Sequence, residues 1–262
     1  MERKSIYVAF SNQKGGVGKS AFTTLAASFL QFERKLNVVL IDCDYPQHSI
    51  FAMRERDKSM VCTNDIYKEM MVNQFETIGK KAYPVLKAKV DEAIKLADKL
   101  VHESPEPIDV VFFDLPGTVN SPGMLQTIVS LDYVFCPIIT DRFVMQSSLT
   151  FATTMGDFLK KNPAAPLKNI YLFWNQLVKS ENRDLYDSYM SVIGSLNLNL
   201  LQTEIPFTVK YKREMPCTSC KAQVSPGSRQ VFRSTLFPPD RMLIKGTNLD
   251  LLVNEICQII NI

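Results

Sequence analysis

A glycine-rich stretch near the start of the chain carries the residues whose types and spacing most clearly indicate chemistry. Residues 14–20 read Lys-Gly-Gly-Val-Gly-Lys-Ser. Glycines let backbone N–H groups approach an anion closely, and the unpaired donors at a following helix start favour negative charge. Lys19 would reach the β- and γ-phosphates of a nucleotide, and the Ser20 hydroxyl would bind Mg²⁺. The predicted phosphate-binding residues are Lys14, Gly15, Gly16, Val17, Gly18, Lys19, Ser20 and Ala21.

Three aspartates lie where apolar runs end, which is the second chemical signal. Asp42 and Asp44 follow residues 37–41, and Asp114 closes residues 110–114. Ligands bind at the carboxyl ends of parallel strands. Beside a nucleotide, one carboxylate orders Mg²⁺ and another orients or deprotonates an attacking water. We therefore predict Ser20, Asp42 and Asp114 as the magnesium residues, Asp114 in the manner of a Walker B aspartate, and Asp44 as a catalytic residue.

The elements that must position these side chains follow from the hydrophobic pattern. Residues 6–10 are continuously apolar, as in a strand buried on both faces, and residues 21–32 show one apolar helical face. Strand, glycine loop and helix is the order of phosphate-binding units. The pattern predicts further strands at 37–41, 110–114, 133–139, 170–174 and 203–206, and helices at 83–101, 143–158, 185–196 and 248–260. We expect one or two helices in residues 51–78, with Met53, Met60, Met70 and Met71 in the core.

The expected fold class is α/β: a doubly wound, mostly parallel sheet flanked by helices, with residues 1–262 forming a single P-loop domain. A hydrophobic content of 46% and a charged content of 22% are typical of a soluble globular protein. The net charge of +3 is small, so an anionic partner would meet a local patch. Six scattered cysteines, no apolar run of membrane-spanning length and no signal peptide indicate a cytoplasmic protein.

Residues 12–20, NQKGGVGKS, resemble the deviant Walker A motif K-G-G-x-G-K-[ST] of the ParA/MinD superfamily, and especially its ParA branch. The segment DCDYPQ is similar to the family's D-x-D-P-Q, with Tyr45 inserted, and Gly117 replaces the second proline of its D-x-P-P segment. The resemblance implies a slow, partner-stimulated ATPase that uses ATP and Mg²⁺. It also implies that Lys14 reaches the partner's ATP in a nucleotide-sandwich homodimer, which makes Lys14, Lys19 and Asp44 catalytic. Asn175 and Pro206 match residues that lie beside the adenine.

Basic residues gather in the last fifth of the chain, where they indicate a phosphate-backbone contact or a solvated face. Short ParA proteins bind nonspecific DNA through their C-terminal half, and this chain resembles the short type. The resemblance thus implies a role in partitioning or positioning a plasmid, chromosome or mobile element, with a ParB-like or conjugation-related protein partner. The DNA-binding candidates are Lys210, Lys212, Arg213, Arg229 and Arg233.

A cysteine pair, Cys217 and Cys220, supports an alternative function. A closed zinc or iron–sulfur site needs four ligands, which a symmetric dimer would supply. The Mrp/ApbC branch of the same superfamily binds an iron–sulfur cluster between subunits in this way, although its pair follows an earlier strand. A MinD-like membrane attachment is disfavoured, because residues 248–262 contain no Lys or Arg.

Overall fold

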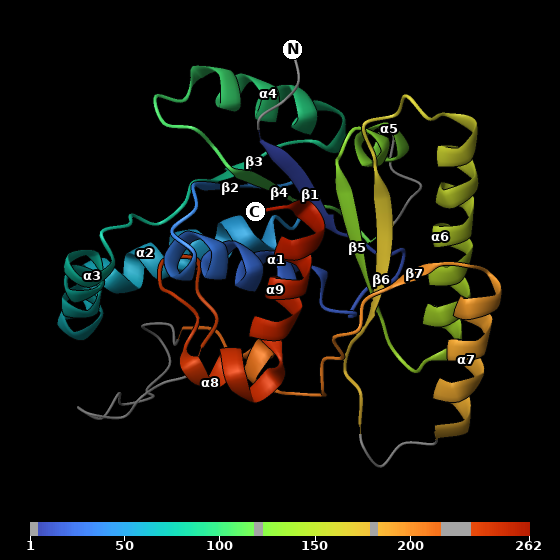
Figure 1. Cartoon of the computed structure of the whole chain (residues 1–262). Coiled ribbons are helices and arrows are strands. Elements are labelled where there is room, and N and C mark those ends of the chain that lie inside the picture. Colours follow the sequence, from blue (N-terminus) through green and yellow to red (C-terminus); the bar gives the residue numbers. More distant parts are fainter. Residues whose placement is uncertain (1–4, 118–122, 179–182, 216–231) are drawn as a thin grey trace.

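One parallel sheet organises the protein in the computed structural model, which describes residues 5–117, 123–178, 183–215 and 232–262 (Figure 1). The described sheet has seven strands in the order β3-β2-β4-β1-β5-β6-β7, and every pairing is parallel. The order reverses beside β1, so the first strand of the chain is central. The strands are β1 (Ile6–Phe10), β2 (Val38–Asp42), β3 (Val85–Lys87), β4 (Val110–Asp114), β5 (Tyr133–Ile138), β6 (Asn169–Trp174) and β7 (Asn199–Leu200).

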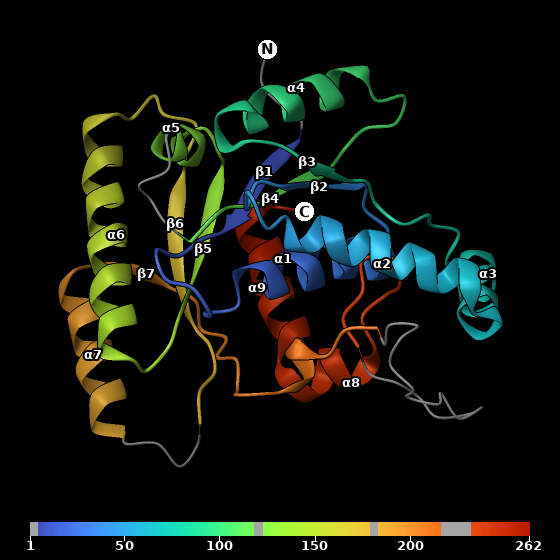
Figure 2. The same ribbon diagram turned by 180° about the vertical axis from the view of Figure 1, so that it is seen from behind.

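Helices cover both faces of the sheet, as Figures 1 and 2 show from opposite sides. Alternate residues of β1 point to different cores: Val8 and Phe10 belong to one hydrophobic cluster, and Tyr7 and Ala9 to the other. The first cluster includes residues of α1 (Lys19–Ser28), α2 (Ser49–Thr63), α8 (Arg241–Ile244) and α9 (Leu249–Ile260). The second includes residues of α4 (Ala93–Glu103), α5 (Met124–Val129), α6 (Arg142–Lys161) and α7 (Arg183–Ser195). This double layer confirms the predicted α/β fold class.

Helix α3 (Asp65–Ile78) extends from α2 at the side of the molecule (Figure 1). A third, smaller cluster joins these helices to the C-terminal part of the chain through Met60, Tyr67, Met215, Phe232, Leu236 and Phe237. Met53 and Met60 are buried as predicted, whereas Met70 is 41% exposed, so its assignment to the core is wrong. In the part of the chain that the structure describes, no helix combines the length and apolar character needed to cross a membrane.

The predicted helix at residues 83–101 is wrong in its first half. These residues form β3, a 3₁₀ turn η2 (Val90–Glu92) and α4. The edge of β2 needs hydrogen-bond partners, and it obtains them when Pro84 accepts from Leu40 N at 3.0 Å and Leu86 pairs with Ile41. A strand partner for β2 therefore outweighs the local helical spacing.

The predicted strand at residues 203–206 is also wrong, because the last strand among the described residues is β7 and Pro206 makes only an isolated bridge with Leu177. Proline has no N–H for a strand ladder. Helix α5 was not predicted. The remaining short elements are a π-helical turn η1 (Phe29–Glu33) after α1 and two 3₁₀ turns, η3 (Lys210–Lys212) and η4 (Lys245–Thr247).

Candidate functional site

The glycine loop lies between the end of β1 and the start of α1, as predicted. Gly16 and Gly18 have φ values of 78° and 98°, a left-handed conformation that glycine adopts without strain. A Cβ atom on Gly18 would also lie 3.0 Å from Asn175 Nδ2 and 3.1 Å from the Phe22 ring. The glycine at position 18 is therefore required twice, by backbone conformation and by close packing.

Two amides at the end of β6 hold this loop. Asn175 Nδ2 donates to Val17 O at 2.9 Å, and Gln176 Nε2 donates to Gly16 O at 3.0 Å. Asn175 is buried. The predicted contact of Asn175 with adenine stays a prediction, but the structure gives this residue a definite second role. It fixes the Val17 carbonyl, as Gln176 fixes that of Gly16, and a loop whose carbonyls are held in this way can turn its N–H groups toward an anion.

The two lysines of the loop lie in different surroundings. Lys14 is exposed, while Lys19 lies between the loop and the carboxylates and donates to Lys14 O at 3.0 Å. Burial lowers the pKa of Lys19, and the nearby carboxylates of Asp114 and Asp44 oppose this shift. A partly desolvated ammonium interacts more strongly with an incoming phosphate than an exposed one does.

Asp114 is the most unusual side chain of the site. It is fully buried at the end of β4, and neither carboxylate oxygen has a hydrogen-bond partner among the described residues. Burial and the neighbouring Asp42 raise the pKa of Asp114 to about 7, although the Ser20 hydroxyl lowers it in part. A buried carboxylate without partners is costly, and a bound cation would offset that cost.

Asp42 and Asp44 have different roles in the structure. The buried Asp42 carboxylate accepts from the backbone N–H groups of Asp44, Ile50 and Phe51 at 2.9–3.1 Å, so it fixes the loop and the start of α2. The Asp44 side chain is half-buried, and burial together with Asp42 raises its pKa. The more accessible Asp44 suits a water-orienting role, and Asp42 supports its position.

Mg²⁺ fits these residues in a particular way. Among the described residues, no group of three His, Cys, Asp or Glu side chains is arranged to hold a metal. Mg²⁺ usually keeps several waters and binds one or two carboxylates together with substrate phosphates. The orphaned oxygens of Asp114 and the adjacent Ser20 hydroxyl match that requirement.

A cavity of about 700 Å³ joins the predicted residues at the carboxyl edge of the sheet. Its walls include Gly15, Lys19, Ser20, Ala21, Asp44, Gly117, Asn175 and Pro206. Sequence reasoning missed Tyr45, Gln176, Phe207 and Tyr211, which line the same cavity. Gln176 follows Asn175 directly, but nothing local indicates that its φ of 56° and its amide bond serve the loop.

The predicted DNA-binding residues fall into three groups. Lys212 and Arg213 are exposed and Lys210 is half-buried, in or beside η3. Arg233 lies in the wall of the cavity with 14% of its side chain exposed. Arg229 lies outside the described residues, as do Cys217 and Cys220, the cysteine pair of the alternative function. The basic patch at 210–213 is therefore accessible beside the cavity, while Arg233 faces a different environment.

Comparison with known proteins agrees with this geometry. Residues 8–215 match the family described as the CobQ/CobB/MinD/ParA nucleotide binding domain. A search of curated proteins found no match. Among solved structures, a putative plasmid partition protein from Borrelia burgdorferi bound to AMPPNP is similar, with a TM-score of 0.50 and 17% identity over 77% of this chain and 88% of that one.

Two further structures resemble the chain. Cobyrinic acid a,c-diamide synthase from Mycobacterium smegmatis, with a bound ATP analogue and magnesium, has a TM-score of 0.53 and 20% identity, covering 78% of this chain and 85% of that one. MinD in the MinC:MinD cell division complex of Aquifex aeolicus has a TM-score of 0.50 and 13% identity, covering 79% and 83%. At these identities the similarity shows the fold alone.

Proposed function

Because the chain belongs to the CobQ/CobB/MinD/ParA nucleotide-binding domain family, we propose that it is a ParA-like ATPase whose nucleotide state controls dimerisation and binding to nonspecific DNA. The observation that carries the proposal is a cavity lined by the glycine loop and the desolvated Lys19 ammonium, with the orphaned Asp114 carboxylate buried beside Ser20 and Lys19 of its wall. ATP is the proposed substrate and Mg²⁺ the proposed cofactor, since one similar structure holds AMPPNP and another holds an ATP analogue with magnesium.

The loop residues bind the phosphates. The N–H groups of residues 15–21 and the Lys19 ammonium neutralise the β- and γ-phosphates. Ser20 and Asp114 would hold Mg²⁺, with Asp42 acting through water, and the ion supplies charge neutralisation at the phosphates when bound. Asn175 and Pro206 line the same cavity, and the proposal assigns them to the base.

Hydrolysis and switching use the remaining residues. Asp44 orients the attacking water, and its raised pKa makes it a better proton acceptor than an ordinary aspartate. The exposed Lys14 extends to the partner's ATP in a homodimer, which couples nucleotide binding to assembly. Turnover is slow and stimulated by a protein partner, and hydrolysis reopens the dimer.

DNA binding is assigned to the exposed basic patch at residues 210–213. Lys210 lies against α8 and η4, since its Nζ donates to Met242 O of α8 at 3.4 Å and a Cβ on Gly246 of η4 would lie 3.4 Å from that Nζ. Lys212 lines the nucleotide cavity. A surface that shares a residue with the cavity wall is well placed to respond to the nucleotide, and partitioning of a plasmid, chromosome or mobile element would use that response.

The first experiment measures binding to random-sequence duplex DNA with ATP, ADP or no nucleotide over a range of salt. We expect ATP-dependent binding that weakens steeply with salt and persists longer in Asp44→Ala. The double variant Lys210→Gln/Arg213→Gln should reduce the salt slope by about 0.9 for each lost phosphate contact. Lys95→Gln/Lys99→Gln, on the exposed side of α4, is the charge-matched control.

The outcomes separate the parts of the proposal. ATP turnover without DNA binding would keep the ATPase and overturn the DNA-partitioning role. Absence of ATP binding by the wild type would overturn the ATPase itself. Iron or zinc in the purified protein that is lost in Cys217→Ser/Cys220→Ser would favour the iron–sulfur carrier alternative.

A further inference from the structure

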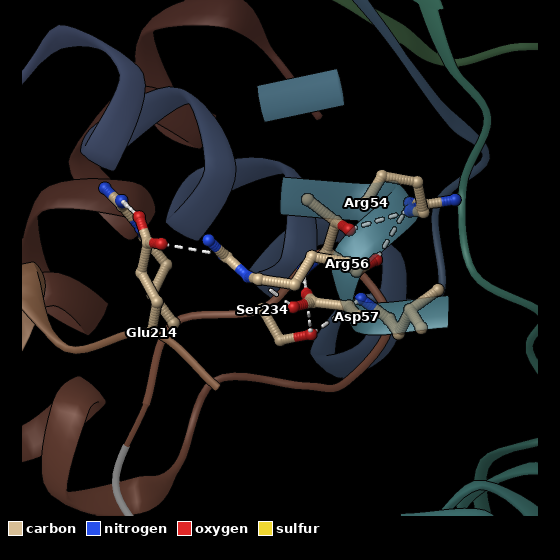
Figure 3. A network of polar contacts seen from close by, with 8 residues as sticks. Arg54, Arg56, Asp57, Glu214 and Ser234 are labelled. Carbon is tan, nitrogen blue, oxygen red and sulfur yellow. Dashed lines mark hydrogen bonds and ion pairs between the residues drawn. The ribbon is translucent and has the colours of Figure 1, made fainter. Parts of the chain in front are cut away.

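A network of charged side chains connects α2 to the C-terminal part of the chain beside the nucleotide cavity (Figure 3). Arg54 is buried and donates to Thr235 Oγ1 at 2.7 Å and to Thr235 O at 2.9 Å. Asp57, fully buried, accepts from Ser234 Oγ at 2.8 Å. These contacts hold residues 234–235 firmly against α2, so the preceding residue 233 has a fixed place in the fold.

One carboxylate in this network is shared between two arginines. Glu214 Oε1 lies 2.7 Å from Arg233 Nη2, and Glu214 Oε2 lies 2.7 Å from Arg56 Nη2. The backbones of Glu214 and Arg233 form an isolated parallel bridge, in which Arg233 N donates to Arg213 O at 2.8 Å. The pairing is therefore built by main chain and side chain together.

The charges of this group do not balance. Three guanidinium groups, those of Arg54, Arg56 and Arg233, lie in this network with two carboxylates, Asp57 and Glu214, and Arg54 hydrogen-bonds Thr235 rather than a carboxylate. Asp57 Oδ1 and Arg233 Nε are buried without hydrogen-bond partners among the described residues. A cluster with one excess positive charge and unused donors is suited to one further anion.

Arg233 is the member of the group that reaches the nucleotide cavity. It lines the cavity together with Ala21, Phe22, Tyr211 and Lys212, while Arg54, Arg56 and Glu214 are absent from its walls. Because most of its side chain is buried, Arg233 has little contact with the outer surface and is poorly placed to bind DNA. Its guanidinium can exchange one anion, the Glu214 carboxylate, for another that enters the cavity.

We propose that Arg233 binds a phosphate of the nucleotide and that Glu214 is a positioning residue that competes for the same guanidinium. This inference rests on the proposed ATPase function and adds a contact from the C-terminal part of the chain to the site. Nucleotide binding draws Arg233 from Glu214 and leaves Glu214 to Arg56 alone. The exchange links the occupancy of the cavity to the segment that carries the exposed basic patch.

The test is ATP affinity measured by calorimetry for four chains: wild type, Arg233→Gln, Glu214→Gln and the double variant. We expect Arg233→Gln to weaken ATP binding about 10- to 100-fold, the range for a charged hydrogen bond. Arg233→Lys should recover part of the loss. Glu214→Gln should strengthen ATP binding about 3- to 10-fold, since the competing charge is gone. That gain should vanish in the double variant, because Arg233 carries it.

Arg34→Gln is the matched control, because Arg34 is exposed directly after η1 and donates a hydrogen bond to Asn254 away from the cavity. Melting temperatures check that each variant is folded. ATP binding by wild type and Arg233→Gln with equal affinity would overturn the inference and leave the ATPase intact. Equal weakening of ATP and adenosine would also overturn it, since the contact would then be to the nucleoside. No ATP binding by the wild type would instead overturn the proposed function.

Discussion

Asp114 shows how a single residue is maintained at a cost in free energy. It ends β4 directly beside Asp42 at the end of β2, so two carboxylates share one buried edge of the sheet. Asp42 receives three backbone N–H donors, while Asp114 receives no hydrogen bond from the described residues. The difference assigns structural support to Asp42 and leaves Asp114 ready for a cation.

This arrangement predicts an unusual pH dependence. The ordinary pKa of 3.8 for Asp114 rises to about 7 in the folded protein, so the native state holds a proton that the unfolded chain releases. Stability therefore falls as pH rises between these two values, and the contribution is constant above about pH 7. Asp114→Asn removes this slope. In urea unfolding without nucleotide or Mg²⁺, the free energy of unfolding of the variant relative to the wild type should increase by about 2–3 kcal/mol from pH 5 to pH 8. Parallel pH profiles of the free energy of unfolding for the two proteins would contradict the predicted contribution of Asp114.

The glycines of the loop differ in what they tolerate. Gly18→Ala places a Cβ 3.0 Å from Asn175 Nδ2 at a φ of 98°, whereas a Cβ on Gly15 meets nothing within 4 Å. We expect Gly18→Ala to lower the free energy of unfolding by about 1–3 kcal/mol and Gly15→Ala to change it by less than about 0.5 kcal/mol. Chemical denaturation compares the two. A similar loss in both would show that the conformation at position 18 is not the cause.

At the scale of elements, α2 joins the nucleotide edge to the C-terminal part of the chain. It starts where Asp42 accepts from Ile50 N, and further along it carries Arg54 and Asp57 to residues 234–235. The helix has little amphipathic pattern because it buries charged side chains with specific partners. Its position therefore depends on polar contacts as well as on its buried apolar residues Ile50, Met53 and Met60.

Loss of one such contact should be measurable. Arg54→Ala removes two hydrogen bonds to Thr235 and a guanidinium that lies 5.1 Å above the Tyr83 ring. We expect a loss of about 2–4 kcal/mol in the free energy of unfolding, because the partner groups are left buried. Lys58→Ala on the same helix removes only an exposed pair with Glu55 and should cost less than about 1 kcal/mol. Equal effects in urea unfolding would show that the burial of Arg54 contributes nothing.

Local signals explain which elements the sequence could predict. The strand, loop and helix of residues 6–28 were predicted correctly, because the apolar run, the glycines and the apolar helical face are adjacent in the chain. The prediction missed edge strand β3, because its three residues acquire their conformation from pairing with β2, some 45 positions earlier. The role of Gln176 could not be predicted for the same reason, since its hydrogen bond to Gly16 O spans 160 positions. Contacts distant in the chain leave no local pattern.

At the scale of the whole molecule, the cavity lies where the order of strands reverses, beside the central strand β1. Its walls come from residues 15–49, from Pro116 and Gly117, and from residues 175–233, so a ligand there contacts both halves of the chain. A bound ligand therefore stabilises the fold as a unit, and its effect appears in the global unfolding transition.

Mg-ATP should raise the melting temperature through this linkage. At a free ligand concentration of 100 times the dissociation constant, the free energy of unfolding rises by about 2.7 kcal/mol. For a chain of this size the melting temperature then rises by about 5–10 °C. Lys19→Ala should abolish the shift. The melting temperature of this variant without ligand should change very little, because the substitution also removes the cost of partly burying the ammonium. Lys160→Ala, at an exposed site on α6, should keep the full shift. A shift retained in Lys19→Ala would contradict the phosphate-binding role of this lysine.

The central position of β1 has a consequence for folding during synthesis on the ribosome. β1 is synthesised first, but Ile6 pairs with Val110 and Val8 with Tyr133, both more than 100 residues later. At about 5–20 residues per second, this apolar strand waits roughly 5–25 s for its neighbours. Chaperones that shield nascent apolar segments should therefore matter for the yield of this protein, and slowing translation before residue 110 should lengthen its exposure.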